Sequence, residues 1–244
     1  MTETNQFFSA YIHADFIGKM IFWALFILSL VAWTIMIYKI WAFYKVKKDC
    51  QSFYHFFQDK KEEPLKLIID NPKKFTTPLL INPYLDIYKT LKSKTVEILN
   101  KNNYFQTTDE ENPAVYLSRE DMDLVESHIF STIARQVKWL EKQLFLLPTI
   151  VTLGPFLGLL GTVWGILITF SELQSKAMLG NTNSAILAGL SMALATTVLG
   201  LAVAIPALIG NSYLKAAVKE MQKDMEHYSI DLLGSLEMQY RKVQ

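Results

Sequence analysis

Three long apolar segments constrain this chain more than any other feature of its sequence. A helix needs roughly 20 apolar residues to cross a bilayer. The segments 20–38, 144–170 and 185–213 meet that requirement without a single Asp, Glu, Lys, Arg or His. Hydrophobic residues make up 51% of the 244, which is high for a water-soluble domain. The sequence therefore predicts an all-α membrane protein with three transmembrane helices.

The basic residues predict how these helices cross the membrane. Of the 24 lysines and arginines, only Lys19 precedes the first span and only Lys176 lies between the second and third. Basic residues favour the cytoplasmic side of a membrane. We therefore expect a periplasmic tail over 1–19, a cytoplasmic helical region over 39–143, a periplasmic loop over 171–184 and a cytoplasmic C-terminal helix over 214–244.

Two amphipathic stripes predict that the second and third helices extend into the cytoplasm as long rods. Ser118 followed by Asp121 has the pattern of a helix start. Apolar residues then recur at steps of three and four up to the second span, and a similar stripe follows the third. The two stripes are Met122, Val125, Ile129, Ile133, Val137, Leu140 and Leu144, and Leu214, Val218, Met221, Met225, Tyr228, Leu232 and Leu236.

Composition excludes several functional classes. The 24 basic side chains nearly balance the 23 acidic ones, whereas nucleic-acid-binding proteins are strongly basic. The four histidines are scattered without metal-ligand spacing, so we expect neither a metal nor a cofactor. Cys50 is the one cysteine, and it falls in the region expected to be cytoplasmic. There it is expected to be a free thiol whose labelling reports the orientation of the chain.

Small residues form one face on each of the last two spans, and small faces let membrane helices approach closely. Threonines lie at the edges of these faces, and a proline inside each span predicts a kink. Two interpretations remain open for the threonines: packing alone, or a hydroxyl-lined ion pathway. The packing residues are Gly154, Gly158, Gly161, Gly165, Gly189, Ala193, Gly200 and Ala204, the pathway candidates are Thr162, Thr196 and Thr197, and the prolines are Pro155 and Pro206.

The spans carry no Asp, Glu, Lys, Arg or His, although intramembrane proton relays usually depend on such a side chain. A chain of this kind that conducts protons therefore needs a partner to supply a carboxylate, or must rely on water and hydroxyl groups.

The run 154–166, GPFLGLLGTVWGI, and the run 193–207, ALATTVLGLAVAIPA, resemble the second- and third-span signatures of the TolQ/ExbB proton-channel family. The resemblance implies a homopentamer in the bacterial inner membrane around a TolR/ExbD-type single-span partner that carries an essential Asp. Proton flow would then drive a TolA- or TonB-type protein, and the pore threonines of the family match Thr162 and Thr197. The glutamate usual for this family is replaced by Met192, and Ser29 and Trp33 are more similar to TolQ than to ExbB.

Two other classes of protein have weaker support in the sequence. The run 189–193 is close to a G-x-S-x-G elbow but lacks its last glycine, and no span holds a histidine that could act as base. An S-x-x-K spacing at Ser212 and Lys215 lies where a lysine is expected to reach the membrane surface. We therefore do not expect an enzyme. The remaining alternative is a passive scaffold or transporter permease subunit that uses its small-residue faces only to assemble.

Overall fold

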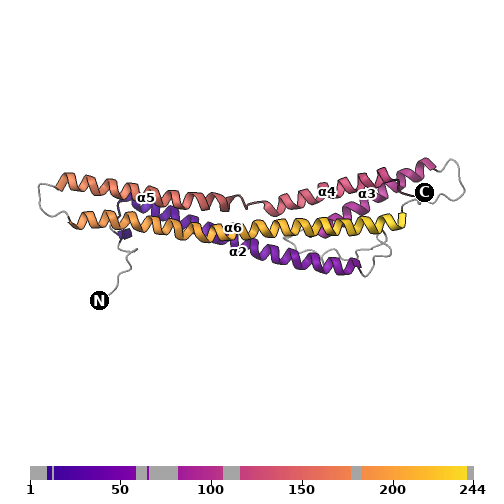
Figure 1. Cartoon of the computed structure of the whole chain (residues 1–244), viewed down its shortest axis with the longest axis horizontal. Helices are drawn as coiled ribbons and strands as arrows, with labels where there is room; N and C mark the ends of the chain where they lie inside the picture. The colour runs from indigo at the N-terminus through magenta and orange to yellow at the C-terminus, as the bar shows by residue number, and fades with distance from the viewer. Residues whose placement is uncertain are drawn as a thin grey trace. The chain divides into compact units, whose positions relative to one another are not determined.

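The fold is described from a computed structural model, which covers residues 10–12, 14–58, 65, 82–106, 116–176 and 183–240. Figure 1 shows a set of long helices, and the described residues contain no β-strand. Three helices are long and apolar enough to cross a membrane. The prediction of an all-α membrane protein with three such helices is therefore confirmed. The helices are α2 (Phe16–Gln58), α3 (Pro83–Gln106), α4 (Arg119–Glu141), α5 (Leu146–Lys176) and α6 (Asn183–Tyr240).

The chain divides into two compact units, and both α2 and α6 contribute to each of them. We call Met1–Lys39 with Gln143–Leu214 the membrane unit, because it contains the three apolar segments. We call Ile40–Lys142 with Lys215–Gln244 the polar unit, because most of the charged residues fall in it.

In the membrane unit, α2 packs parallel to α6. A Cβ atom on Gly18 would lie 2.5 Å from the Met192 sulfur, and one on Gly210 would lie 2.6 Å from the Met36 sulfur. Residue numbers therefore rise in the same direction along both helices. Parts of the predicted periplasmic segments, residues 1–9, 13 and 177–182, lie outside the described residues.

The apolar stripe of 122–144 was predicted to run directly into the second span as one helix. In the structure this helix is interrupted. Helix α4 ends at Glu141, α5 begins at Leu146, and Gln143 between them has a φ of 73°. Pro148 explains the break, because its ring clashes with the carbonyl four residues earlier in a continuous helix. In the structure Pro148 lies in the first turn of α5, where no backbone N–H is needed.

The stripes of α4 and α6 form much of the core of the polar unit. The six stripe residues from Val218 to Leu236 are buried, as are Val125, Ile129, Ile133 and Leu140 of α4, and Leu214 is buried at the end of the membrane unit. The start of α4 is confirmed as well. The Ser118 side chain accepts a hydrogen bond from the backbone of Asp121, and the Asp121 side chain accepts one from the backbone of Ser118.

Cys50 lies in an aromatic part of this core. The residue is 2% exposed, and its thiol donates a hydrogen bond to Asn82 Oδ1 at 3.4 Å. The same Asn82 oxygen accepts from the backbone N–H of Tyr84 at 3.0 Å, so Asn82 also caps α3. Burial raises the pKa of the Cys50 thiol to about 12. The expectation that Cys50 is a ready probe of orientation is therefore wrong, because thiol reagents attack the thiolate and need access to it.

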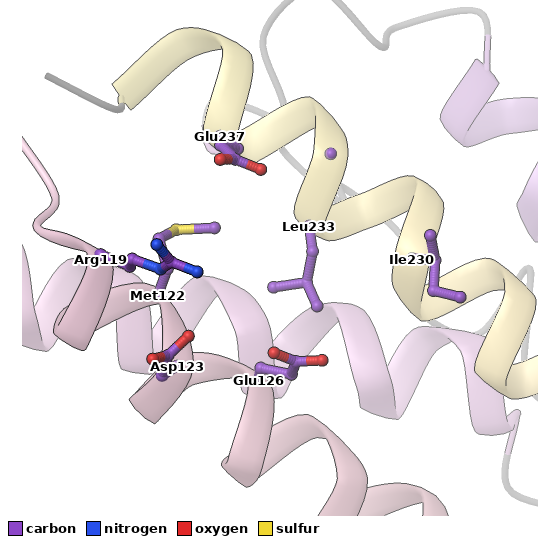
Figure 2. A pocket seen from close by; sticks show the side chains of 8 residues that line it. Arg119, Met122, Asp123, Glu126, Ile230, Leu233 and Glu237 are labelled. Carbon is purple, nitrogen blue, oxygen red and sulfur yellow. The ribbon is translucent and has the colours of Figure 1, made fainter. Parts of the chain in front are cut away.

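A shallow groove of about 400 Å³ separates α4 from α6 within the polar unit. Figure 2 shows Asp123 and Glu126 of α4 on one side, and Leu233 and Glu237 of α6 on the other. Gly234 also lines the groove, and a Cβ atom added there would meet nothing within 4 Å. The two helices are therefore not tightly closed along this stretch.

Candidate functional site

Helices α5 and α6 approach backbone to backbone in the membrane unit. A Cβ atom on Gly154 would lie 3.0 Å from the carbonyl oxygen of Gly200, and one on Gly158 would lie 3.0 Å from the Cα atom of Thr197. Residue numbers rise along α5 as they fall along α6, so the two helices are antiparallel. A Cβ atom at either glycine would be closer to the α6 backbone than an ordinary van der Waals contact, and small residues permit such an approach.

The close contact continues along α5 toward its C-terminal end. A Cβ atom on Gly161 would lie 2.5 Å from the Thr196 Cβ, and one on Gly165 would lie 2.7 Å from the carbonyl oxygen of Gly189. The Cβ atom of Ala193 also lies against Gly165. The structure thus brings together the packing residues predicted on both helices, and we call this contact the glycine seam.

The three candidate threonines differ in where they lie relative to the glycine seam. Thr196 is fully buried in the seam and donates to the carbonyl oxygens of its own helix, including that of Ala193 at 2.8 Å. Thr197 is half-buried, and its hydroxyl donates across the seam to the carbonyl oxygen of Gly158 at 3.1 Å. Thr162 is also half-buried and donates to the carbonyl oxygen of Leu159 at 2.6 Å. Thr196 is therefore positioned for packing, whereas Thr162 and Thr197 keep part of their surface outside the seam.

Gly158 relates the position of Thr197 to that of Thr162, because the Thr197 hydroxyl donates to the Gly158 carbonyl oxygen. Thr162 lies four residues after Gly158 on α5, so the two threonines are separated by about one helical turn, a rise of roughly 6 Å. A hydroxyl group has one hydrogen, and in both residues that hydrogen is directed to a backbone carbonyl. Each hydroxyl oxygen can therefore still accept a hydrogen bond from another group.

Pro155 and Pro206 both lie inside continuous helices, α5 and α6 respectively. Each removes one backbone donor, which frees the carbonyl oxygen four residues earlier, at Val151 and at Ala202. The kinks expected at these prolines remain predictions.

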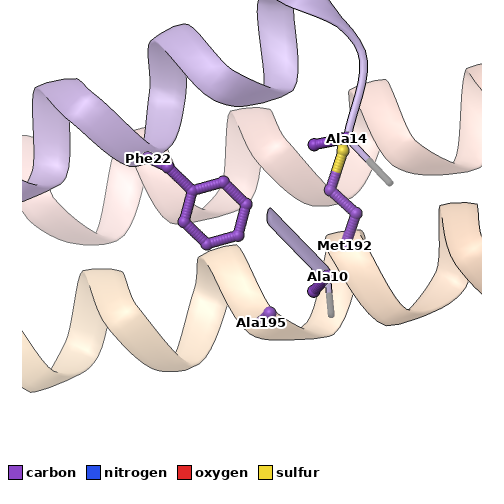
Figure 3. Packing of buried hydrophobic residues seen from close by; sticks show 5 residues of the cluster. All are labelled: Ala10, Ala14, Phe22, Met192 and Ala195. Carbon is purple, nitrogen blue, oxygen red and sulfur yellow. The ribbon is translucent and has the colours of Figure 1, made fainter. Parts of the chain in front are cut away.

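Met192 belongs to a packed cluster and is 2% exposed. Figure 3 shows its side chain directed toward Ala14, with Ala10, Phe22 and Ala195 completing the cluster. Met192 thus packs the segment before α2 against α6. Periodicity alone gave no indication of this contact, because the segment lies outside the apolar spans.

Asp15 is a carboxylate of the membrane unit that the sequence analysis did not identify. It precedes α2, and its Oδ1 accepts a hydrogen bond from the backbone N–H of Gly18 at 2.9 Å. Its Oδ2 accepts one from Trp164 Nε1 of α5, also at 2.9 Å. An aspartate directly before an apolar helix is a recognisable capping signal. Its partner on α5 could be found only from the structure.

The sequence profile of the MotA/TolQ/ExbB proton channel family matches residues 97–227, which is more than half of the chain. The chain belongs to this family. The resemblance seen in the two span signatures is thereby confirmed, and the region matched includes the glycine seam and all three candidate threonines.

Curated relatives agree with this family assignment. The chain is 42% identical over 97 residues to a biopolymer transport protein ExbB of Aquifex aeolicus, covering 40% of this chain and 64% of the relative. It is 40% identical over 94 residues to a putative ExbB-like 2 protein of Helicobacter pylori, covering 38% and 61%. It is 32% identical over 94 residues to a Tol-Pal system protein TolQ of Haemophilus influenzae, covering 38% and 40%. In each case the chain spans less than two thirds of the relative.

The region that matches the family profile, residues 97–227, includes only part of the residues described above. It covers Trp164 and Met192 but neither Asp15 nor any part of α2. The described residues contain no group of three or more His, Cys, Asp or Glu side chains that could hold a metal ion. The chemistry available within the seam is therefore that of threonine hydroxyls and backbone carbonyls.

The glycine seam predicts a large difference between two glycine substitutions. Gly161→Ala places a methyl group against the Thr196 side chain, which should lower the stability by about 1–3 kcal/mol. Gly234→Ala, the matched control, adds its methyl group to open space in a helix and should raise stability by up to about 1 kcal/mol. Thermal unfolding of the detergent-purified protein measures both. Equal melting temperatures for the two variants would contradict the tight seam.

Proposed function

We propose that the chain is a pore-forming subunit of an inner-membrane motor of the TolQ/ExbB type, driven by the proton-motive force. Its work would be passed to a partner directed at the outer membrane, in envelope integrity, division or import. The observation that carries the proposal is the pair Thr162 and Thr197, half-buried at the edge of a tight seam with their oxygens left to accept hydrogen bonds. Membership of the proton channel family supports it.

The threonine geometry suits a proton carrier supplied from outside the chain. Because both hydroxyl hydrogens are directed to backbone carbonyls, the oxygens fit a group that donates a hydrogen bond, such as water or a protonated carboxyl. A carboxylate that has taken up a proton could pass these acceptors, whereas an ionised one would find no donor in these two hydroxyls. The proposed pair of threonines therefore distinguishes a protonated carboxyl group from an ionised one.

We propose that five copies of the chain enclose the membrane helices of a TolR/ExbD-type partner, whose Asp supplies this carboxyl group. The glycine seam supports this arrangement, because it fixes the spacing of α5 and α6 and so holds both threonines in one geometry. A TolA- or TonB-type protein would receive the motion. Identity is higher to the ExbB relatives than to TolQ, so we propose the motor role common to both types. In this role the chain is not an enzyme.

The second candidate is a passive scaffold or permease subunit. Thr169 and Thr196 favour it in part, since both are buried and donate to carbonyl oxygens of their own helices, as packing threonines do. The scaffold interpretation gives no role to the half-exposed hydroxyls of Thr162 and Thr197. Substitution at those two positions therefore distinguishes the candidates.

The mass of the assembly tests the motor proposal directly. We expect the chain, purified in mild detergent after expression with its genomic neighbours, to form a pentamer with two copies of a small single-span protein. Native mass spectrometry measures the stoichiometry. A monomer, or an assembly without an acidic single-span partner, would favour the scaffold.

Thr197→Val should leave this assembly intact and reduce proton flux into liposomes by at least about tenfold, because the acceptor oxygen is removed. Thr197→Ser is the matched control, since it retains the hydroxyl and the hydrogen bond to Gly158. It should conduct nearly as the wild type does. A Thr197→Val complex with full flux would leave the hydroxyl without a role in conduction.

We propose that the N-terminus is periplasmic and the C-terminus cytoplasmic, as the distribution of basic residues favours. The test starts from Cys50→Ser, because Cys50 itself is buried, its pKa is about 12, and it should stay unreactive at pH 8. In that background an impermeant maleimide should label Asn181→Cys in intact cells. Ser52→Cys, at an exposed position of α2, should be labelled only after lysis. The reverse pattern would overturn the orientation.

A further inference from the structure

One face of α2 changes in character along the helix, from apolar through aromatic to basic. Ile37 is exposed inside the first span, and Trp41 and Tyr44 beyond it are 53% and 73% exposed. Lys48 is exposed and Lys45 is half-buried on the same face. Steps of three and four residues relate these positions, so they lie along one stripe of the helix. We call Trp41, Tyr44, Lys45 and Lys48 the aromatic-basic face.

The contacts of this part of α2 within the polar unit lie on its other sides. Val46 is buried, and Lys47 forms an ion pair with Glu220 of α6 at 2.8 Å. Neither Lys45 nor Lys48 forms an ion pair with a residue that the structure describes. Both amines, and the two aromatic rings beside them, are therefore available to a group from outside the chain.

The aromatic-basic face begins where the first apolar span ends. Helix α2 continues without a break from Phe16 to Gln58, and the span predicted over 20–38 lies inside it. The rise from the end of the span is about 4.5 Å to Trp41 and about 10 Å to Lys45. The headgroup region adds roughly 5–7 Å to each side of the hydrocarbon core of a bilayer. Side chains of a helix tilt toward its N-terminus, here toward the span, so the long lysine stems lean back to the headgroups.

We propose that the aromatic-basic face binds the headgroup of an anionic phospholipid. The amines of Lys45 and Lys48 pair with the lipid phosphate. Trp41 and Tyr44 lie at the depth of the glycerol and ester groups, where aromatic side chains are favoured. A zwitterionic lipid carries its own amine next to the phosphate, so it gains less from the two lysines. The inference goes beyond the motor proposal, because it concerns the contact of the chain with lipid and requires no proton flow.

The alternative occupant of this face is a second copy of the chain. A second copy would have to bring acidic side chains to the two lysines, and it would shield Trp41 from lipid. Bromine atoms on a lipid quench the fluorescence of a tryptophan that they contact. Quenching of Trp41 by brominated lipids therefore distinguishes the two occupants.

The experiment uses the full chain, with the partners that co-purify, reconstituted in phosphatidylcholine bilayers. Phosphatidylglycerol brominated near the headgroup end of its acyl chains is added in increasing fractions, and brominated phosphatidylcholine gives the reference. The contribution of Trp41 is the difference in quenching between the wild type and Trp41→Phe. The two titrations give the relative affinity of the site for the anionic and the zwitterionic lipid.

We expect the site at Trp41 to bind phosphatidylglycerol at least about fivefold more tightly than phosphatidylcholine. Lys45→Gln combined with Lys48→Gln should bring the two affinities to within about twofold of each other, because both cations are removed. Lys89→Gln combined with Lys101→Gln is the matched control. It removes two exposed lysines of α3 and should keep the preference of the wild type.

The proposal is overturned if the wild type binds the two lipids with affinities within about twofold of each other. It is equally overturned if the variant without Lys45 and Lys48 keeps the preference, since the lysines would then not contact the lipid. Quenching of Trp41 by neither lipid would mean that protein covers the face, and would overturn the proposal as well. Native mass and melting temperature check that each variant assembles and folds as the wild type does.

Discussion

The contact of α5 with α6 determines the geometry of the membrane unit. Four glycines on α5 allow carbonyl oxygens and threonine side chains of α6 to reach the helix backbone. In a lipid environment no water is expelled when two apolar helices meet, so close packing and hydrogen bonds must supply the attraction. The bond from Thr197 to the Gly158 carbonyl is one such interaction, and it requires that Gly158 has no side chain.

The contact between α5 and α6 places two neighbouring threonines in different environments. Thr196 and Thr197 are neighbours in the chain, yet one is enclosed by the seam and the other lies at its edge. A helix turns about 100° per residue, so adjacent positions cannot share a face. The two neighbouring threonines therefore differ in packing, and only Thr197 has surface left for another group.

Much of this arrangement could be predicted from residue periodicity. The stripe from Leu214 to Leu236 is buried along its whole length, and the glycines of α5 face those of α6, because both patterns repeat at the period of a helix. Periodicity was a poor guide at Gln143, where the φ of one residue interrupts the helix while the apolar spacing continues. Pro148 was the signal in the sequence for this break, because a proline ring clashes with the carbonyl group four residues earlier in a continuous helix.

The features that the sequence did not reveal depend on contacts between distant parts of the chain. Asp15 and Trp164 are separated by 149 positions, and Cys50 and Asn82 by 32. Neither pair has a periodic pattern. Each partner has an ordinary local interpretation, as a helix cap, an apolar span residue or a free thiol. Only tertiary packing gives these residues their second role.

The absence of a side chain at Gly18 has an evolutionary consequence. Because the Met192 sulfur occupies the space that a Cβ atom at position 18 would need, the two positions share one volume between them. Homologues should therefore vary at these sites in a correlated manner: a shorter residue at 192 would permit alanine or serine at 18, and a long one would keep glycine there. Their pairing would let a sequence alignment trace the contact between α2 and α6 across the lineage.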